Sequence, residues 1–127
     1  MKKIIQTSSA PAPIGPYSQA VLVDNMLYTS GQIALDATSG ELVLENIAQE
    51  TNKVMENMRA VLAAAEMDFS HVIKSSIFLS DMNYFNQVNE VYAKYFDENT
   101  APARETVQVA GLPKGVNVEI SMIATIN

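Results

Sequence analysis

The sequence predicts an α+β fold, in which a mixed or antiparallel sheet carries two helices on one face. Two stretches with helical spacing, residues 46–67 and 81–96, flank an alternating stretch at 72–79 that is typical of a strand. Three short strand-like runs precede the first helix, and two longer runs follow the second. The predicted order of elements is therefore β-β-β-α-β-α-β-β.

Strand and turn signals account for the first part of the chain. Residues 3–6 fit a short edge strand that leads into a proline-containing loop. Two apolar runs at 17–23 and 26–30 are separated by an Asp-Asn pair at 24–25, which is a favourable two-residue hairpin turn. We therefore expect a β-hairpin in this region.

The stretch at 46–67 has an apolar and a polar side. We expect the apolar side to pack on the sheet and the polar side to face solvent. The positions expected in the core are Ile47, Val54, Met58, Val61, Leu62 and Ala65. The positions expected in solvent are Glu50, Lys53, Glu56 and Arg59.

The second half of the chain begins with the strand at 72–79. Its alternation places Ile73, Ile77 and Leu79 on one face. Asp81 is then the expected N-cap of the second helix.

The last two strands are expected near 104–110 and 116–126. In the final strand the even-numbered residues are apolar and share one face, while the other face mixes polar and apolar residues. The sheet surface away from the helices is therefore a candidate for subunit contact, with ligand pockets between subunits.

Composition limits the possible classes of protein. With 127 residues, the chain is expected to form one domain, spanning 1–127, with a sizeable core. The longest purely apolar run, at 60–65, is far too short for a membrane span. The lack of cysteine fits a cytoplasmic location. The net charge of −6 argues against a nucleic-acid partner.

No motif points to a cofactor. His71 is the only histidine, so neither a serine-type catalytic triad nor a zinc site has a supporting pattern. The chain contains no glycine-rich dinucleotide motif and no phosphate-binding loop. We therefore expect a protein that works without a metal or an organic cofactor.

The C-terminal third places one cation and one carboxylate inside alternating apolar runs. Arg104 lies in the segment Pro-Ala-Arg-Glu-Thr-Val at 102–107, and Glu119 lies between Val118 and Ile120. Charges within strands are costly to bury unless they are paired or used. This pattern indicates a protein that handles a small anionic ligand.

The register of the last two strands decides whether these charges can meet. If the strands form a direct hairpin, a four-residue loop places Thr106 opposite Glu119, whereas a five-residue loop places Arg104 and Glu119 on opposite faces. A bulge, or a site assembled across subunits, would remove this conflict.

Four segments, in order along the chain, resemble the RidA (YjgF) family. They are Ala-Pro-Ile-Gly-Pro-Tyr-Ser-Gln-Ala at 12–20, Thr-Ser-Gly-Gln-Ile at 29–33, Phe-Asn-Gln-Val-Asn-Glu-Val-Tyr at 85–92, and Pro-Ala-Arg at 102–104 with Leu-Pro at 112–113 and Val-Glu-Ile at 118–120. This resemblance implies a chorismate-mutase-like fold. It also implies a homotrimer with sheets inside, helices outside and a pocket at each subunit interface.

The resemblance further implies a reaction, the hydrolysis of reactive enamines and imines to 2-oxo acids and ammonia. Examples are 2-aminoacrylate, 2-iminopropanoate and 2-iminobutanoate, which are released by pyridoxal-phosphate enzymes such as threonine dehydratase. The implied partners are small 2-imino and 2-oxo acids and further copies of the chain, with no cofactor, nucleic acid or membrane.

Two charged residues are the expected catalytic groups. The carboxylate of a 2-imino acid calls for a planar, permanently charged fork, which Arg104 supplies better than a lysine. Glu119 can serve as a general base for the hydrolytic water or carry a proton to the departing nitrogen. A solvated or ion-paired Arg104, and a Glu119 neutralised by Arg104 or Lys114, are the structural alternatives.

Five further residues belong to the expected site. Tyr17 resembles the family's pocket tyrosine, whose hydroxyl binds substrate or water. Ser30, Gly31 and Gln32 lie at a strand end, where the missing side chain of glycine lets other groups approach a ligand. Thr106 stands where many family members carry a cysteine, so it offers a hydroxyl to a ligand but no thiol chemistry.

Two other functions remain open from the sequence. A non-catalytic regulatory trimer would bind small carboxylates through the same arginine. RNA cleavage, described for some family members, is disfavoured by the acidic balance and by the lack of a basic, aromatic face.

Overall fold

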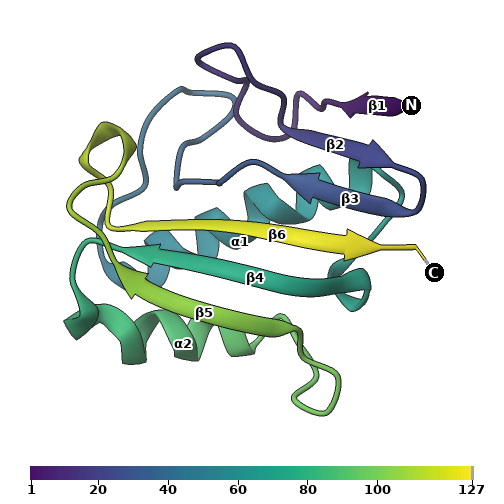
Figure 1. Ribbon diagram of the computed structural model, residues 1–127. Coiled ribbons are helices and arrows are strands. Elements are labelled where there is room, and N and C mark those ends of the chain that lie inside the picture. The colour runs from purple at the N-terminus through teal and green to yellow at the C-terminus, as the bar shows by residue number, and fades with distance from the viewer. Residues whose placement is uncertain (127) are drawn as a thin grey trace.

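Figure 1 shows the chain as a computed structural model, which describes residues 1–126. One sheet forms the front layer in this view, and both helices lie behind it. The strands are β1 (Lys2–Ile5), β2 (Ala20–Val23), β3 (Met26–Thr29), β4 (Val72–Leu79), β5 (Ala103–Gln108) and β6 (Val118–Thr125), and the helices are α1 (Ile47–Ala64) and α2 (Phe85–Ala93). The α+β class and the predicted order of elements are confirmed.

The sheet has six strands in the order β1-β2-β3-β6-β4-β5. The last strand, β6, lies inside the sheet and runs antiparallel to both β3 and β4. Strands β4 and β5 are parallel because α2 carries the chain back between them, as in a βαβ unit. The sheet is therefore mixed, and β5 forms one of its edges.

The hairpin considered for the last two strands is wrong. Strand β4 lies between β5 and β6, so Glu119 pairs with Phe78 and Thr106 pairs with Ile77. The parallel crossover through α2 places β5 on the outer side of β4 and leaves the inner side of β4 for β6. The length of the loop at 111–115 consequently has no influence on which faces Arg104 and Glu119 occupy.

The core lies between the sheet and the helices. Its fully buried side chains include Leu27, Met55, Met58, Leu62, Ile77, Leu79 and Ile120. The predicted alternation of β6 is confirmed, because Val118, Ile120, Met122 and Ala124 are all buried. Glu119 therefore points away from the helices, on the opposite face of the sheet.

Helix α1 begins where predicted but buries a residue expected in solvent. The side chain of Asn46 caps the helix by accepting the backbone N–H of Gln49 at 2.8 Å. Glu50, expected on the polar side, is 0% exposed. Helical period alone placed it wrongly, because its carboxylate is satisfied by hydrogen bonds to the start of β6.

The second half departs from prediction in local details. Ile73 is 45% exposed and does not share a face with Ile77, because the register of β4 against β6 shifts at a bulge after Val72. Asp81 acts as an N-cap, although it caps a 3₁₀ turn at Met82–Tyr84 that precedes α2.

The sheet face away from the helices is uncovered in the single chain. It exposes apolar side chains from several strands, among them Ile4, Tyr28 and Val107. Beside them, Lys74 and Glu105 form an ion pair at 3.0 Å. The mixed character predicted for this face is confirmed. Within residues 1–126, no helix is long and apolar enough to cross a membrane.

Candidate functional site

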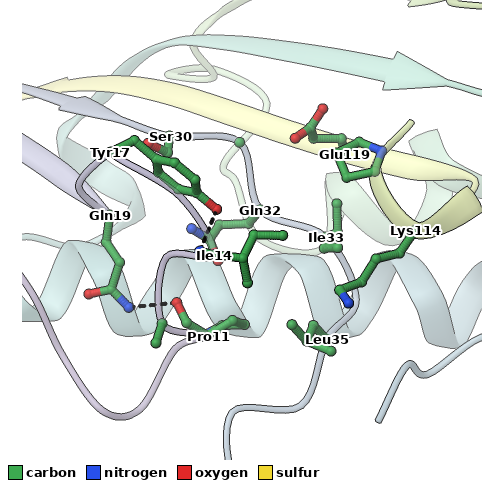
Figure 2. Close-up of a pocket in the computed structure, with 13 residues that line it drawn as sticks. Pro11, Ile14, Tyr17, Gln19, Ser30, Gln32, Ile33, Leu35, Lys114 and Glu119 are labelled. Carbon is green, nitrogen blue, oxygen red and sulfur yellow. Dashed lines mark hydrogen bonds between the residues drawn. The ribbon is translucent and has the colours of Figure 1, made fainter. Parts of the chain in front are cut away.

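A cavity of about 380 Å³ lies where the loop before β2, the segment after β3 and the start of β6 meet. Figure 2 shows the side chains that surround it. Its lining residues are Pro11, Ala12, Ile14, Tyr17, Gln19, Ser30, Gly31, Gln32, Ile33, Leu35, Pro113, Lys114 and Glu119. Five of the seven predicted site residues are thus brought together: Tyr17, Ser30, Gly31, Gln32 and Glu119.

Within the cavity, the side chain of Glu119 packs directly against Gly31. A Cβ atom added at Gly31 would lie 2.5 Å from Oε2 of Glu119 and 2.7 Å from its Cδ. Real Cβ atoms do not approach other atoms this closely, so a side chain at position 31 would displace the glutamate. Gly31 is therefore required by close approach rather than by a special backbone conformation.

Glu119 is a carboxylate without a partner. Within the part of the chain that the structure describes, no hydrogen bond or ion pair engages it, and neither Arg104 nor Lys114 neutralises it. Burial of the side chain raises its pKa above the ordinary glutamate value. A carboxylate with a raised pKa in a cavity holds a proton more readily than an ordinary glutamate, which suits it to accept and return one.

The loop before β2 forms one wall and is held by Gln19. Its side-chain oxygen accepts the backbone N–H of Thr7 at 2.7 Å, and its amide nitrogen donates to the carbonyls of Thr7, Ala10 and Pro11 at 3.0, 3.2 and 2.8 Å. Because Gln19 is buried, these bonds fix the path of the loop. Sequence reasoning missed this residue, although it lies inside the 12–20 segment.

Tyr17 lies in this loop and not in a strand as predicted, since β2 begins at Ala20. Its hydroxyl accepts the backbone N–H of Ile14 at 3.3 Å, the contact that Figure 2 marks with a dashed line. The residue is 50% exposed. The phenol therefore stands at the rim of the cavity, where its hydroxyl can reach a ligand or water.

The opposite wall is formed by the segment after β3. The hydroxyl of Ser30 donates to the carbonyl of Ser18 at 2.6 Å, which ties the two walls together. The backbone of Gln32 exchanges two hydrogen bonds with Ile120, at 2.8 and 3.1 Å. This bridge extends the sheet beyond β3 and holds Gly31 beside Glu119.

Lys114 is the one cation among the lining residues, and it comes from the 3₁₀ turn at Pro113–Gly115. Its backbone has a φ of 57°, a left-handed conformation that is uncommon for a non-glycine residue. Figure 2 shows its side chain at the edge of the group. The sequence signal for this residue is its place beside the Leu-Pro pair of the C-terminal segment.

Arg104 and Thr106 do not line this cavity. The guanidinium carbon of Arg104 lies 5.0 Å from the ring centroid of Tyr92 and 5.7 Å from that of Phe85, both on the helical side of the sheet. Stacking on aromatic faces suits the planar guanidinium. Arg104 and Glu119 of one chain therefore lie on opposite faces of the sheet.

Arg104 and Thr106, both in β5, have polar groups that are available for a further partner. Residues 1–126 contain no ion pair or hydrogen-bond acceptor for the guanidinium of Arg104, and the buried Oγ1 of Thr106 also lacks a partner there. Beneath the guanidinium, the hydroxyl of Tyr92 donates to Oγ of Ser75 at 2.8 Å. Desolvation raises the pKa of Tyr92, which keeps the phenol neutral below the arginine.

The fold and the cavity define a class of protein. It is an α+β protein with a pocket in which a carboxylate packs against a glycine and a tyrosine lies at the rim. Among known proteins, the family described as endoribonuclease L-PSP matches residues 7–126. The human 2-iminobutanoate/2-iminopropanoate deaminase is 49% identical over 124 residues, which cover 98% of this chain and 90% of the human protein.

Solved structures agree with this match. The structure of E. coli TdcF with bound serine has a TM-score of 0.92 and 42% identity, covering 98% of this chain and 99% of that one. RidA from an Antarctic Psychrobacter species has a TM-score of 0.93 and 43% identity, with coverage of 98% and 99%. The chain belongs to the endoribonuclease L-PSP family, and the resemblance to RidA is confirmed.

Replacement of Gly31 tests the close packing. We expect Gly31→Ala to move the Glu119 side chain and to lower catalytic efficiency about a hundredfold, since an ångström-scale displacement of a reacting group has an effect of that order. The matched control is Gly111→Ala, because nothing lies within 4 Å of a Cβ added there. Equal activities in the two variants would contradict the packing argument.

Stability against pH tests the burial of Glu119. Because its pKa is raised in the folded protein, the stability linked to its protonated form is complete below the ordinary glutamate pKa of about 4.3 and is lost as the pH rises through the folded-state value. Glu119→Gln should therefore raise the free energy of urea unfolding relative to the parent protein at pH 7, and make little difference at low pH. Exposed Glu90→Gln should show no such pH-dependent gain.

Proposed function

We propose that this protein hydrolyses small 2-imino acids, in equilibrium with their enamines, to 2-oxo acids and ammonia. The observation that carries the proposal is the unpaired, partly buried carboxylate of Glu119 against Gly31, in a family whose mammalian members at 48–50% identity are 2-iminobutanoate/2-iminopropanoate deaminases. The corresponding substrates are 2-iminopropanoate, formed from 2-aminoacrylate, and 2-iminobutanoate. We place this chemistry in the cytoplasm, in keeping with a chain without cysteine.

Glu119 has the properties that the hydrolysis needs. Its ionised carboxylate accepts a proton from water as the water oxygen bonds to the imine carbon. Glu119 passes this proton to the nitrogen, which gives the tetrahedral carbinolamine. The hydroxyl proton of the carbinolamine then follows the same route to the nitrogen as the C–N bond breaks, so that the carbonyl forms and ammonia leaves. The raised pKa brings the proton affinity of Glu119 closer to neutral pH, where it can both take and return the proton. No cofactor enters this sequence of steps.

Arg104 is the proposed anchor for the substrate carboxylate. A guanidinium that already stacks on Tyr92 and Phe85 and has no acceptor of its own within residues 1–126 presents a free, preoriented fork. The unpartnered hydroxyl of Thr106 on the same strand can donate a further hydrogen bond to that carboxylate. The serine in the E. coli TdcF structure is a small molecule of comparable size.

The remaining predicted residues shape the pocket. In the proposal, the hydroxyl of Tyr17 binds substrate or water at the rim of the cavity. Ser30 and Gln32 are held by the bonds described above, so they keep the wall behind Gly31 in place. Gly31 leaves the space in which Glu119 reaches the reacting carbon.

The two halves of this site come together only if a second copy of the chain takes part. Arg104 lies on the edge strand β5, while Glu119 lies on the opposite face of the sheet. A contact between these two different surfaces is heterologous, and a heterologous contact whose rotation closes forms a ring. We therefore propose the homotrimer that the family resemblance implies, in which the uncovered apolar sheet face lies inside.

A second candidate is a regulatory trimer that binds carboxylates without catalysis, which the serine-bound relative favours. RNA cleavage is suggested by the names of the family and of some relatives, and the net charge of −6 opposes it. One assay, the turnover of 2-iminobutanoate, distinguishes both of these candidates from the deaminase.

Imine turnover tests the role of Arg104. With 2-iminobutanoate generated by threonine dehydratase and trapped by semicarbazide, the protein should accelerate imine loss. Arg104→Lys should lower kcat/KM roughly 30- to 100-fold, because a lysine keeps the charge but loses the bidentate fork. The matched control is Arg59→Lys, since Arg59 also stacks on two rings, Phe69 and Tyr95, but already has an ion-pair partner in Glu56.

The same assay separates the candidate functions. Binding of 2-oxo acids without any acceleration of imine loss would favour the regulatory trimer over the enzyme. Cleavage of RNA at physiological salt, with a steep dependence of affinity on salt concentration, would favour the endoribonuclease activity in the family's name. An Arg59→Lys variant as impaired as Arg104→Lys would contradict the specific role of Arg104.

Subunit mixing tests the shared site. In analytical ultracentrifugation, the assembly should have a mass three times the 13.8 kDa of one chain. Arg104→Ala and Glu119→Gln should each be inactive alone, but after joint refolding of equal amounts about one quarter of the sites should combine both intact residues, because each site then draws them from different subunits. No recovery in mixed trimers would show that the site does not cross subunits.

A further inference from the structure

Three polar side chains of helix α1 are buried: Thr51, which donates to the carbonyl of Ile47 within the helix, and Glu50 and Asn57, which bind segments outside it. Glu50 is 0% exposed and Asn57 is 2% exposed. Their spacing of seven residues, or two helical turns, places them on the same side of the helix. They lie among apolar neighbours, and neither lines the cavity.

Glu50 binds the start of β6. Its Oε2 accepts the backbone N–H groups of Asn117 and Val118 at 2.7 and 3.0 Å, and its Oε1 accepts the side-chain amide of Asn117 at 3.0 Å. The other end of that amide accepts the hydroxyl of Ser80 at 2.8 Å. The carboxylate of Glu50 is thereby attached to the two residues that immediately precede Glu119.

Asn57 binds the opposite wall of the cavity. Its side-chain nitrogen donates to the carbonyl oxygens of Ile33 and Leu35, both at 2.9 Å. These two residues belong to the lining segment that begins at Ser30 and includes Gly31. One helix face thus holds both the segment that carries Gly31 and the segment that carries Glu119.

We propose that α1 sets the distance between these two walls, and that Glu50 and Asn57 are positioning residues for the reaction. This inference rests on the proposed function, in which Glu119 is the proton carrier. Because the gap between Gly31 and Glu119 has no room for a methyl group, a small shift of either segment changes where the carboxylate lies. The helix, rather than the sheet alone, then determines the reactive geometry.

The chemistry at Glu50 fits this role. All three of its partners are N–H donors, which only a carboxylate can satisfy together. No cation pairs with it in residues 1–126, so the donors alone compensate its buried charge, with help from its place in the first turn of α1. An amide at this position would turn one acceptor into a donor that faces another donor.

The variant Glu50→Gln tests the proposal. We expect kcat to fall about tenfold while KM stays within about twofold, because the group that acts in the chemical step is displaced and the carboxylate anchor is not. The pKa of the Glu119 carboxyl, measured by carbon-13 NMR, should move toward the ordinary value of about 4.3 as the side chain leaves its buried position. Exposed Glu90→Gln is the matched control and should change neither quantity.

A double variant provides the rescue. In Glu50→Gln with Asn117→Asp, the introduced amide nitrogen can donate to the introduced carboxylate, while the amide oxygen still accepts the two backbone N–H groups. The net charge is the same as in the parent protein. We expect both kcat and the Glu119 pKa to return most of the way to the values of the parent protein. Asn117→Asp alone places a second carboxylate against that of Glu50 and should be impaired.

The outcomes separate the possibilities. A lower melting temperature in Glu50→Gln with unchanged kcat and an unchanged Glu119 pKa would overturn the proposal, because the role would then be structural only. If Glu50→Gln fails to fold, Asn57→Asp, which replaces the donor to Ile33 and Leu35, must show the same loss of kcat for the proposal to stand. Absence of imine turnover in the parent protein would refute the proposed function, while the NMR shift and its rescue would still decide the positioning role.

Discussion

An unpaired carboxylate packed against a glycine is the interaction on which the rest of the site depends. Glu119 lies between Val118 and Ile120, whose burial in the core fixes the orientation of the strand and so turns the glutamate toward the other face. Gly31 leaves free the space beside the carboxylate that any side chain at position 31 would fill. The segments that carry the two residues are joined by the backbone bridge of Gln32 to Ile120 and are attached to the same helix.

The two faces of the sheet carry different groups. The helical face buries the core and holds the guanidinium of Arg104 on a pair of aromatic rings. The other face carries Glu119 beside exposed apolar side chains. Two charged groups without partners in one chain are costly, so a function that uses both accounts for their presence. In the proposed function, a second copy of the chain brings the two faces together.

Much of the fold follows from local patterns. The period of α1, the hairpin turn at 24–25 and the alternation of β6 all act over a few residues, so a short window of sequence reveals them. The errors have a different origin. Glu50 looks like a solvent residue because its partners, Asn117 and Val118, lie 67 and 68 positions away along the chain. The bulge at Ile73 and the place of β5 beyond β4 are likewise set by neighbouring strands.

For the proposed site, the amino-acid sequence alone specified the chemical groups: the fork of Arg104, the carboxylate of Glu119, the phenol of Tyr17 and the bare backbone of Gly31. It did so because residue type and strand period are local properties. The tertiary structure decided which groups meet, since the parallel crossover through α2 and the insertion of β4 put Arg104 and Glu119 on opposite faces. Only long-range pairing brings Gly31 within touching distance of Glu119, and no local pattern records that contact.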